Sequence, residues 1–153
     1  MKQIIIRGLC NLLSVIMLFS LAGCAETPAV KEEEKLLSLK NEGVLSVLTC
    51  ADYEPYEYYD QEGKLCGKDV ELMRSAAEGL GLEIEITVTE FPLIAKDFEG
   101  GAYDLLWAAL DYEEELAEKY EYLEYGFEGS DYKFYIYVDS ENELLSEKLK
   151  ELI

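Results

Sequence analysis

Asp104-Leu105-Leu106-Trp107-Ala108-Ala109-Leu110 is the most informative stretch for the fold of this 153-residue chain. Apolar residues follow one another here without a polar side chain between them. Such a run is typical of a strand that is buried on both faces of a parallel sheet. Because helices must cover both faces of that sheet, the stretch indicates a layered α/β domain.

Strands and helices alternate around this stretch. Residues 70–80 carry apolar side chains at helical spacing, and residues 83–88 alternate between glutamate and apolar or β-branched residues, as in a half-buried strand. The order predicts a single α/β lobe with a mainly parallel sheet flanked by helices. Strands are expected at 44–49, 83–88, 104–110 and 132–138, a hairpin with arms 56–59 and 64–66, and helices at 36–40, 70–80, 91–98, 112–122 and 143–153. The last helix is expected to bury Leu144, Leu145, Leu149 and Leu152.

Residues 1–23 resemble a bacterial lipoprotein signal peptide. A basic start and a short apolar run lead to Leu21-Ala22-Gly23-Cys24, which matches a lipobox. The apolar run is short for a bilayer span, so a cleaved signal is favoured over a transmembrane segment. The resemblance implies lipidation of Cys24, for example with palmitate, and a lipidated tether over residues 24–35. We therefore expect the folded lobe, residues 36–153, on the extracytoplasmic face of the cell membrane, held by lipid.

The composition excludes several classes of function. The chain has 13 Lys and Arg against 33 Asp and Glu, for a net charge of −20, which disfavours nucleic acid and suits either solubility or cationic partners. It contains no histidine, so the commonest general base and metal ligand is missing. A carboxylate pair such as Asp111 and Glu115 could serve acid–base chemistry, but no nucleophile–base arrangement accompanies it. We expect no enzyme, no cofactor and no metal.

Cys50 and Cys66 are the cysteines that remain beyond the lipobox. Outside the cytoplasm a disulfide between them could persist. A disulfide, a metal pair and two separate thiols all stay open, although two thiolates without histidine make a poor zinc site.

Motifs in a fixed order resemble the first lobe of the bacterial extracellular solute-binding proteins of family 3, the receptors of polar amino acid ABC importers. They are residues 36–47, the loop Tyr53-Glu54-Pro55-Tyr56, the helix start Gly67-Lys68-Asp69-Val70-Glu71-Leu72, and residues 93–98 with Gly101-Ala102-Tyr103-Asp104. The resemblance implies a receptor for a small polar solute that works with an ABC permease or a sensor.

The same resemblance implies a ligand site at Cys50, Tyr53, Trp107 and Asp111. Tyr53 keeps the family's aromatic platform, which could stack on a cationic group. The family holds an amino acid's α-carboxylate with hydroxyl groups and an arginine. Here acidic residues beginning at Asp111 replace the hydroxyls and Leu116 stands in place of the arginine, while Cys50 replaces an acid that often contacts the ligand's amino group. The alternatives are that Tyr53 packs the hairpin, Trp107 belongs to the core, and Asp111 lies in a solvated helix start.

Two functions follow as hypotheses. The first is a membrane-anchored binding protein for amino acids or other small amine-bearing solutes. The second is a truncated or degenerate lipoprotein that has lost solute binding and acts through protein–protein contact. Family members close two lobes around the ligand. The strand at residues 135–140 could be the one that leads into a second lobe, which would make the chain a truncated product. It could equally be the returning strand that completes the first lobe with the last helix, and the apolar stripe of that helix favours this second interpretation.

Overall fold

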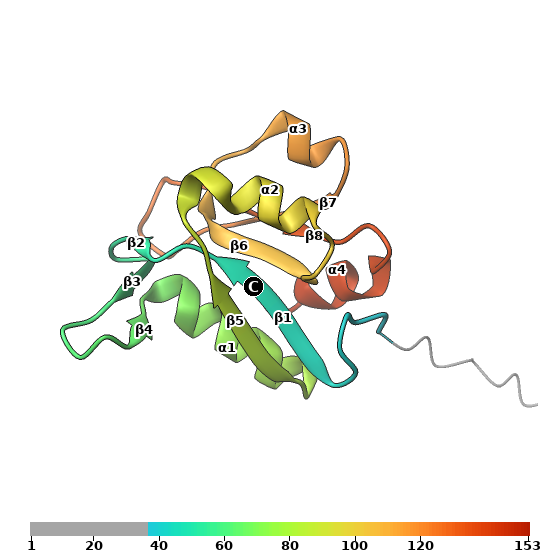
Figure 1. Ribbon diagram of the computed structural model, residues 1–153, viewed down its shortest axis with the longest axis horizontal. Helices are drawn as coiled ribbons and strands as arrows, with labels where there is room; N and C mark the ends of the chain where they lie inside the picture. Colours follow the sequence, from blue (N-terminus) through green and yellow to red (C-terminus); the bar gives the residue numbers. More distant parts are fainter. Residues whose placement is uncertain (1–36) are drawn as a thin grey trace, which may run out of the picture. The chain divides into compact units, whose positions relative to one another are not determined.

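The computed structural model describes residues 37–153, which form a five-stranded sheet with helices on both faces (Figure 1). Strand β1 pairs in parallel with β5 on one side and with β6 on the other. Strand β8 runs antiparallel to both of its neighbours, so four strands point one way and the sheet is mostly parallel, as predicted. In spatial order the strands are β5 (Glu83–Val88), β1 (Val44–Thr49), β6 (Leu105–Leu110), β8 (Phe134–Val138) and β7 (Glu121–Tyr125).

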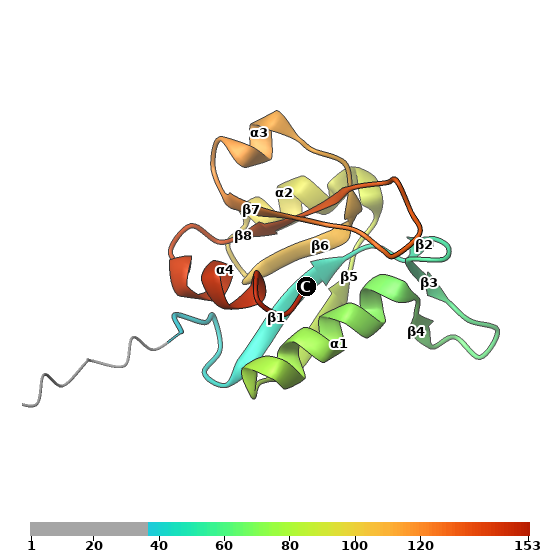
Figure 2. The ribbon, with the colours of Figure 1, turned by 180° about the vertical axis from the view of Figure 1, so that it is seen from behind.

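The helices divide between the two faces of the sheet. Apolar side chains of α1 and α4 pack in one core cluster, and those of α2 and α3 pack in another. Figures 1 and 2 show the same arrangement from opposite sides of the molecule. The bounds are α1 (Lys68–Leu80), η1 (Phe91–Leu93), α2 (Ile94–Glu99), α3 (Glu114–Ala117) and α4 (Glu143–Leu149).

Strand β6 lies at the centre of the sheet and contributes to both clusters. Leu105 and Trp107 face α1 and α4, whereas Leu106 and Leu110 face α2 and α3. Every residue of the strand is buried, which confirms the strand expected from its unbroken apolar run.

A small antiparallel sheet precedes α1 and consists of β2 (Asp52–Tyr53), β3 (Glu57–Tyr59) and β4 (Leu65–Cys66). Strands β3 and β4 form the expected hairpin. Gly67 joins this hairpin to α1 with φ of 126°, and a Cβ atom there would lie 2.1 Å from the carbonyl oxygen of Tyr56. Only glycine therefore allows the hairpin to pass so close to the start of the helix.

The predicted helix at 36–40 is wrong for the residues that the structure describes. Residues 37–40 are irregular, and the chain turns through Gly43 into β1. The reason is the buried carboxylate of Asp104, which accepts hydrogen bonds from the backbone N–H groups of Lys40 and Ser46, each at 2.9 Å. These long-range bonds hold the segment against the sheet in place of helical ones.

The predicted helix at 112–122 is also largely wrong. Only the single turn α3 forms, and the chain then enters the edge strand β7. Leu123 and Tyr125 are buried while the residues beside them are exposed, so the period of the segment is that of a strand. Pairing of β7 with β8 outweighs the helix propensity of its glutamates.

The terminal helix is shorter than predicted. Helix α4 ends at Leu149, and Leu145 and Leu149 are fully buried as expected. Leu144 is half-buried. The predicted burial of Leu152 is wrong: this residue lies beyond the end of the helix, and its side chain is 37% exposed.

The predicted signal peptide (1–23), the lipidated Cys24 and the whole tether (24–35) lie outside the described residues, as does Leu36. Among residues 37–153, no helix has the length and apolar character needed to span a bilayer.

Replacing Gly67 tests the close approach of the hairpin to α1. Gly67→Ala is expected to lower the free energy of unfolding by at least ~3 kcal/mol, because the new Cβ collides with backbone that cannot move cheaply. The control is Gly63→Ala, which also has positive φ (77°) but open space around it, and it should cost about 1–2 kcal/mol. Urea denaturation of both variants checks this, and equal costs would contradict it.

Candidate functional site

The connections of the sheet identify where a ligand site can form. From β1 the chain passes through α1 to β5 on one side, and then through α2 to β6 on the other side of β1. The strand order therefore reverses between β1 and β6. In open α/β sheets, the crevice outside the carboxyl ends of two such strands is the usual place for a ligand.

A cavity of about 280 Å³ lies at this place. It brings together Cys50, Tyr53 and Asp111, three of the four residues that the sequence singled out as ligand-binding. Trp107, the fourth, does not line it: its side chain is fully buried and its ring packs edge-on against Tyr125. The complete lining consists of Cys50, Asp52, Tyr53, Phe91, Ala108, Ala109, Leu110, Asp111 and Glu113.

The cavity has aromatic walls and an acidic rim. Tyr53 and Phe91 are 46% and 51% exposed, so both can offer ring faces to a ligand. Three carboxyl groups belong to the lining, and no lysine or arginine does. Carboxylates attract a cation, and aromatic faces bind it further through their quadrupoles. A carboxylate ligand would be repelled here.

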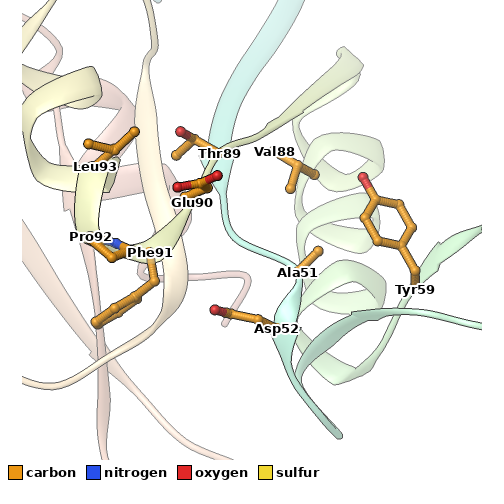
Figure 3. A pocket seen from close by; sticks show the side chains of 9 residues that line it. All are labelled: Ala51, Asp52, Tyr59, Val88, Thr89, Glu90, Phe91, Pro92 and Leu93. Atoms are coloured by element: carbon orange, nitrogen blue, oxygen red, sulfur yellow. The ribbon is translucent and has the colours of Figure 1, made fainter.

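A second hollow of about 730 Å³ adjoins the cavity and shares Asp52 and Phe91 with it. Figure 3 shows Leu93 and Tyr59 on opposite sides of this hollow. It lies at the carboxyl end of the edge strand β5, away from the point where the strand order reverses, and it is open to solvent. The smaller cavity is therefore the better candidate for holding a small solute.

Strand β6 is distorted where it meets the cavity. Its register against β8 shifts between Leu106 and Leu110, and Ala109 has a left-handed φ of 43°. Bulges and strained backbone of this kind occur often at functional sites. The N–H of Ala109 donates a hydrogen bond of 3.0 Å to Oδ2 of Asp69, which holds the distorted backbone in place.

Two fully buried carboxyl groups lie behind the lining of the cavity. The thiol of Cys50 donates to Oε1 of Glu57 at 3.5 Å, and the hydroxyl of Tyr125 donates to Oδ2 of Asp69. Asp69 belongs to the Gly67-Lys68-Asp69 motif, which could have indicated it. Glu57 stands among hairpin tyrosines, and nothing in its sequence context indicated burial.

Burial shifts the titration of these groups. It raises the pKa of Glu57 to about 9, with a further contribution from the charge of Asp69. Burial also raises the pKa of Asp69 to about 6, against the lowering effect of hydrogen bonds from Tyr125 and Ala109. At neutral pH Glu57 is thus protonated and Asp69 is largely ionised. Burial raises the pKa of the Cys50 thiol as well, which keeps it un-ionised and unreactive.

Cys50 and Cys66 are free thiols in the structure. Cys66 donates to the carbonyl oxygen of Tyr58 at 3.6 Å, whereas Cys50 has Glu57 as its partner. The disulfide that the sequence left open is therefore not formed here. Residues 37–153 also contain no group of three or more histidine, cysteine or acidic side chains arranged to hold a metal ion.

Leu116 stands where the resemblance placed an arginine, and it is a core residue. It is 5% exposed in α3 and packs in the cluster with Ile94, Phe98 and Tyr137. The cavity therefore lacks the cation that would hold an α-carboxylate.

The family model of the bacterial extracellular solute-binding proteins, family 3, matches residues 45–144. The chain belongs to this family. Its relatives include cyclohexadienyl dehydratase from Pseudomonas aeruginosa, which is 31% identical over 90 residues, covering 59% of this chain and 34% of the relative. The L-cystine-binding protein TcyA from Bacillus subtilis is 29% identical over 107 residues, covering 65% of this chain and 40% of the relative. The chain thus spans only about a third to two fifths of these relatives.

The solved structure of a single domain of an arginine-binding protein matches over more of its own length than these relatives do. Domain 1 from TmArgBP, in its arginine-bound form, superposes with a TM-score of 0.64 and 27% identity. The match covers 72% of this chain and 90% of that domain. Residues of the α/β lobe therefore correspond to a first domain of the family, as the sequence motifs implied.

The buried Glu57 makes stability depend on pH. Its pKa is raised from an ordinary value of 4.5 to about 9, so the unfolded chain loses this proton at lower pH than the folded protein. Glu57 therefore stabilises fully below pH 4.5, and that contribution is lost progressively as the pH rises towards 9. Between pH 6.5 and 9 the free energy of unfolding should fall more steeply for the unmodified protein than for Glu57→Gln.

Denaturant unfolding at several pH values checks this. The matched control is Glu62→Gln, an exposed glutamate of the same hairpin, which should keep the steep pH dependence. If Glu57→Gln keeps the same slope, Glu57 is not protonated in the folded protein.

Proposed function

We propose that this chain is an extracytoplasmic receptor lobe that binds a small cationic solute in the cavity between the ends of β1 and β6. The observation that carries the proposal is the lining of that cavity, in which Asp52, Asp111 and Glu113 combine with the rings of Tyr53 and Phe91 and with no basic side chain. An amine or guanidinium group fits this chemistry, because it can pair with carboxylates and stack on aromatic faces.

The relatives support a small polar solute. By their names, TcyA binds L-cystine and domain 1 from TmArgBP binds arginine. Family membership together with these amino acid-binding relatives suggests amino acid transport. The buried Leu116 and the acidic rim distinguish this chain, since they favour the cationic end of a solute over its α-carboxylate.

The proposal includes a lipid anchor and a partner. The lipobox at Leu21-Ala22-Gly23-Cys24 supports acylation of Cys24 and attachment to the outer face of the cell membrane. An ABC permease is the partner that the family suggests, and a sensor is the alternative. We propose a binding protein rather than an enzyme, because the matching family is one of solute-binding proteins and several relatives are named as amino acid-binding proteins, although a dehydratase and a murein transglycosylase are also among the relatives.

A second function is favoured by the hollow of Figure 3. Tyr59, Phe91 and Leu93 are 52%, 51% and 43% exposed along it, so it presents apolar surface to solvent. Such a surface suits a lipoprotein that has lost solute binding and acts through protein–protein contact.

Calorimetric titration with arginine and agmatine tests the solute site, because agmatine is arginine without its α-carboxylate. We expect agmatine to bind at least as tightly as arginine, since no cation in the cavity holds the carboxylate. Asp111→Asn should weaken agmatine binding about tenfold by removing one attractive charge. The control Asp131→Asn makes the same charge change at an exposed position outside the cavity and should leave the affinity unchanged.

The outcomes separate the hypotheses. Binding of arginine but not agmatine would show that the carboxylate is recognised and would contradict the acidic site. Failure of both ligands, in a protein that unfolds cooperatively, would favour the protein–protein function.

Cys24→Ala tests the lipid anchor. In a bacterial host this variant should lose incorporation of labelled palmitate and leave the membrane fraction, because the acylated thiol is gone. Cys10→Ala is the matched control, since residue 10 lies within the proposed signal peptide, and it should keep both properties. Labelled palmitate on Cys24→Ala would overturn the assignment of the anchor.

A further inference from the structure

The lining of the cavity is connected directly to two buried acids. Cys50 lines the cavity, and its thiol donates a hydrogen bond to Glu57. Ala109 also lines the cavity, and its N–H donates a hydrogen bond to Asp69. One residue therefore separates each buried carboxyl group from a bound solute. Both carboxyl groups have no exposed surface, so water screens them poorly from charge in the cavity.

The groups around Glu57 supply no positive charge that would balance its ionised form. Its Oε2 atom has no hydrogen-bond partner within residues 37–153, and neither has Oδ1 of Asp69. The groups that face Glu57 are the thiol of Cys50 after β1, the carboxyl of Asp52 from β2, the carboxyl of Asp69 from α1 and the phenol of Tyr125 from β7. None of these four groups is cationic. A positive charge in the cavity would be the missing counter-charge.

We propose that a cationic solute entering the cavity displaces the proton of Glu57, so that binding releases a proton and affinity rises with pH. This inference rests on the proposed function, since it requires a cation in the cavity. Before binding, Glu57 is a neutral carboxylic acid, because burial and the charge of Asp69 disfavour its ionised form. The cation favours the ionised form, and the proton leaves to the solvent without any other reactant. By linkage, the factor by which the bound cation lowers the proton affinity of Glu57 equals the factor by which loss of that proton raises the affinity for the cation.

Because Glu57 is buried and protonated, it affects cation binding in a different way from the carboxylates on the rim of the cavity. Asp52, Asp111 and Glu113 attract any cation that approaches, at every pH where they are ionised. Glu57 contributes only when its proton has gone, so it makes the retention of solute depend on the acidity outside the cell.

The affinity for butylguanidine, measured by calorimetry from pH 7 to pH 10, tests the proposal. A guanidinium group keeps its charge throughout this range, so the probe itself does not titrate. The affinity of the unmodified protein should rise on the order of tenfold as the pH passes through the titration of Glu57. Glu57→Gln should bind with an affinity that changes little with pH, and the exposed control Glu62→Gln should follow the unmodified protein.

A second measurement on the unmodified protein does not depend on the variants folding. Titration at pH 8 in two buffers of different ionisation enthalpy counts the protons released per butylguanidine bound, and we expect a clear fraction of one proton. Binding without proton release, or with the same pH dependence in Glu57→Gln, would overturn the coupling and leave the solute site intact. No binding of butylguanidine at any pH would overturn the cationic site, and the coupling with it.

Discussion

The carboxylate of Asp69 holds together three parts of the chain that are far apart in sequence. It lies at the start of α1, accepts the N–H of Ala109 from β6 and accepts the hydroxyl of Tyr125 from β7. Helix α1 covers one face of the sheet, so this one group fixes the helix against the central strand and, through Tyr125, against the sheet's edge. Its position is in turn set by Gly67, the only residue type that lets the hairpin cross the helix start so closely. The geometry of the cavity depends on this bond because Ala109, in its left-handed conformation, is part of the lining.

Electrostatics organise the site in two layers. The outer layer consists of carboxyl groups on the rim beside exposed aromatic rings, and the inner layer consists of Glu57 and Asp69 without exposed surface. Burying two acids near each other is costly unless at least one stays neutral. The protein meets this constraint by keeping Glu57 protonated while Asp69 receives hydrogen bonds from Ala109 and Tyr125. The neutral member of the pair is the one that the cavity can influence through Cys50.

Much of the fold could be predicted from the sequence, because local patterns and tertiary demands agree there. The apolar run of β6, the alternation in β5 and the helical spacing in α1 each have one structural solution. The errors fall where long-range contacts decide the local structure: residues 37–40 follow the buried Asp104, and β7 follows its pairing with β8. For the site, the motifs led to Cys50, Tyr53 and Asp111, which the structure brings to one cavity. Trp107 does not reach the cavity because it lies further from the carboxyl end of β6 than Ala109 and Asp111, and its side chain packs in the core against Tyr125. Glu57 could not be found because its burial depends on Gly67 and α1 rather than on its neighbours in the sequence.

The core position of Leu116 limits how this lobe can change over evolutionary time. Leu116 packs with Ile94, Phe98 and Tyr137 beneath α3, so an arginine introduced there would place a guanidinium in an apolar cluster at a cost of several kcal/mol. A single codon change therefore cannot recreate the carboxylate clamp that the family motif implies. The helical turn α3 would have to move away from the sheet, and another apolar side chain would have to take the place of Leu116 in the core cluster. For the proposed receptor, this packing favours solutes that are bound without a cation at residue 116.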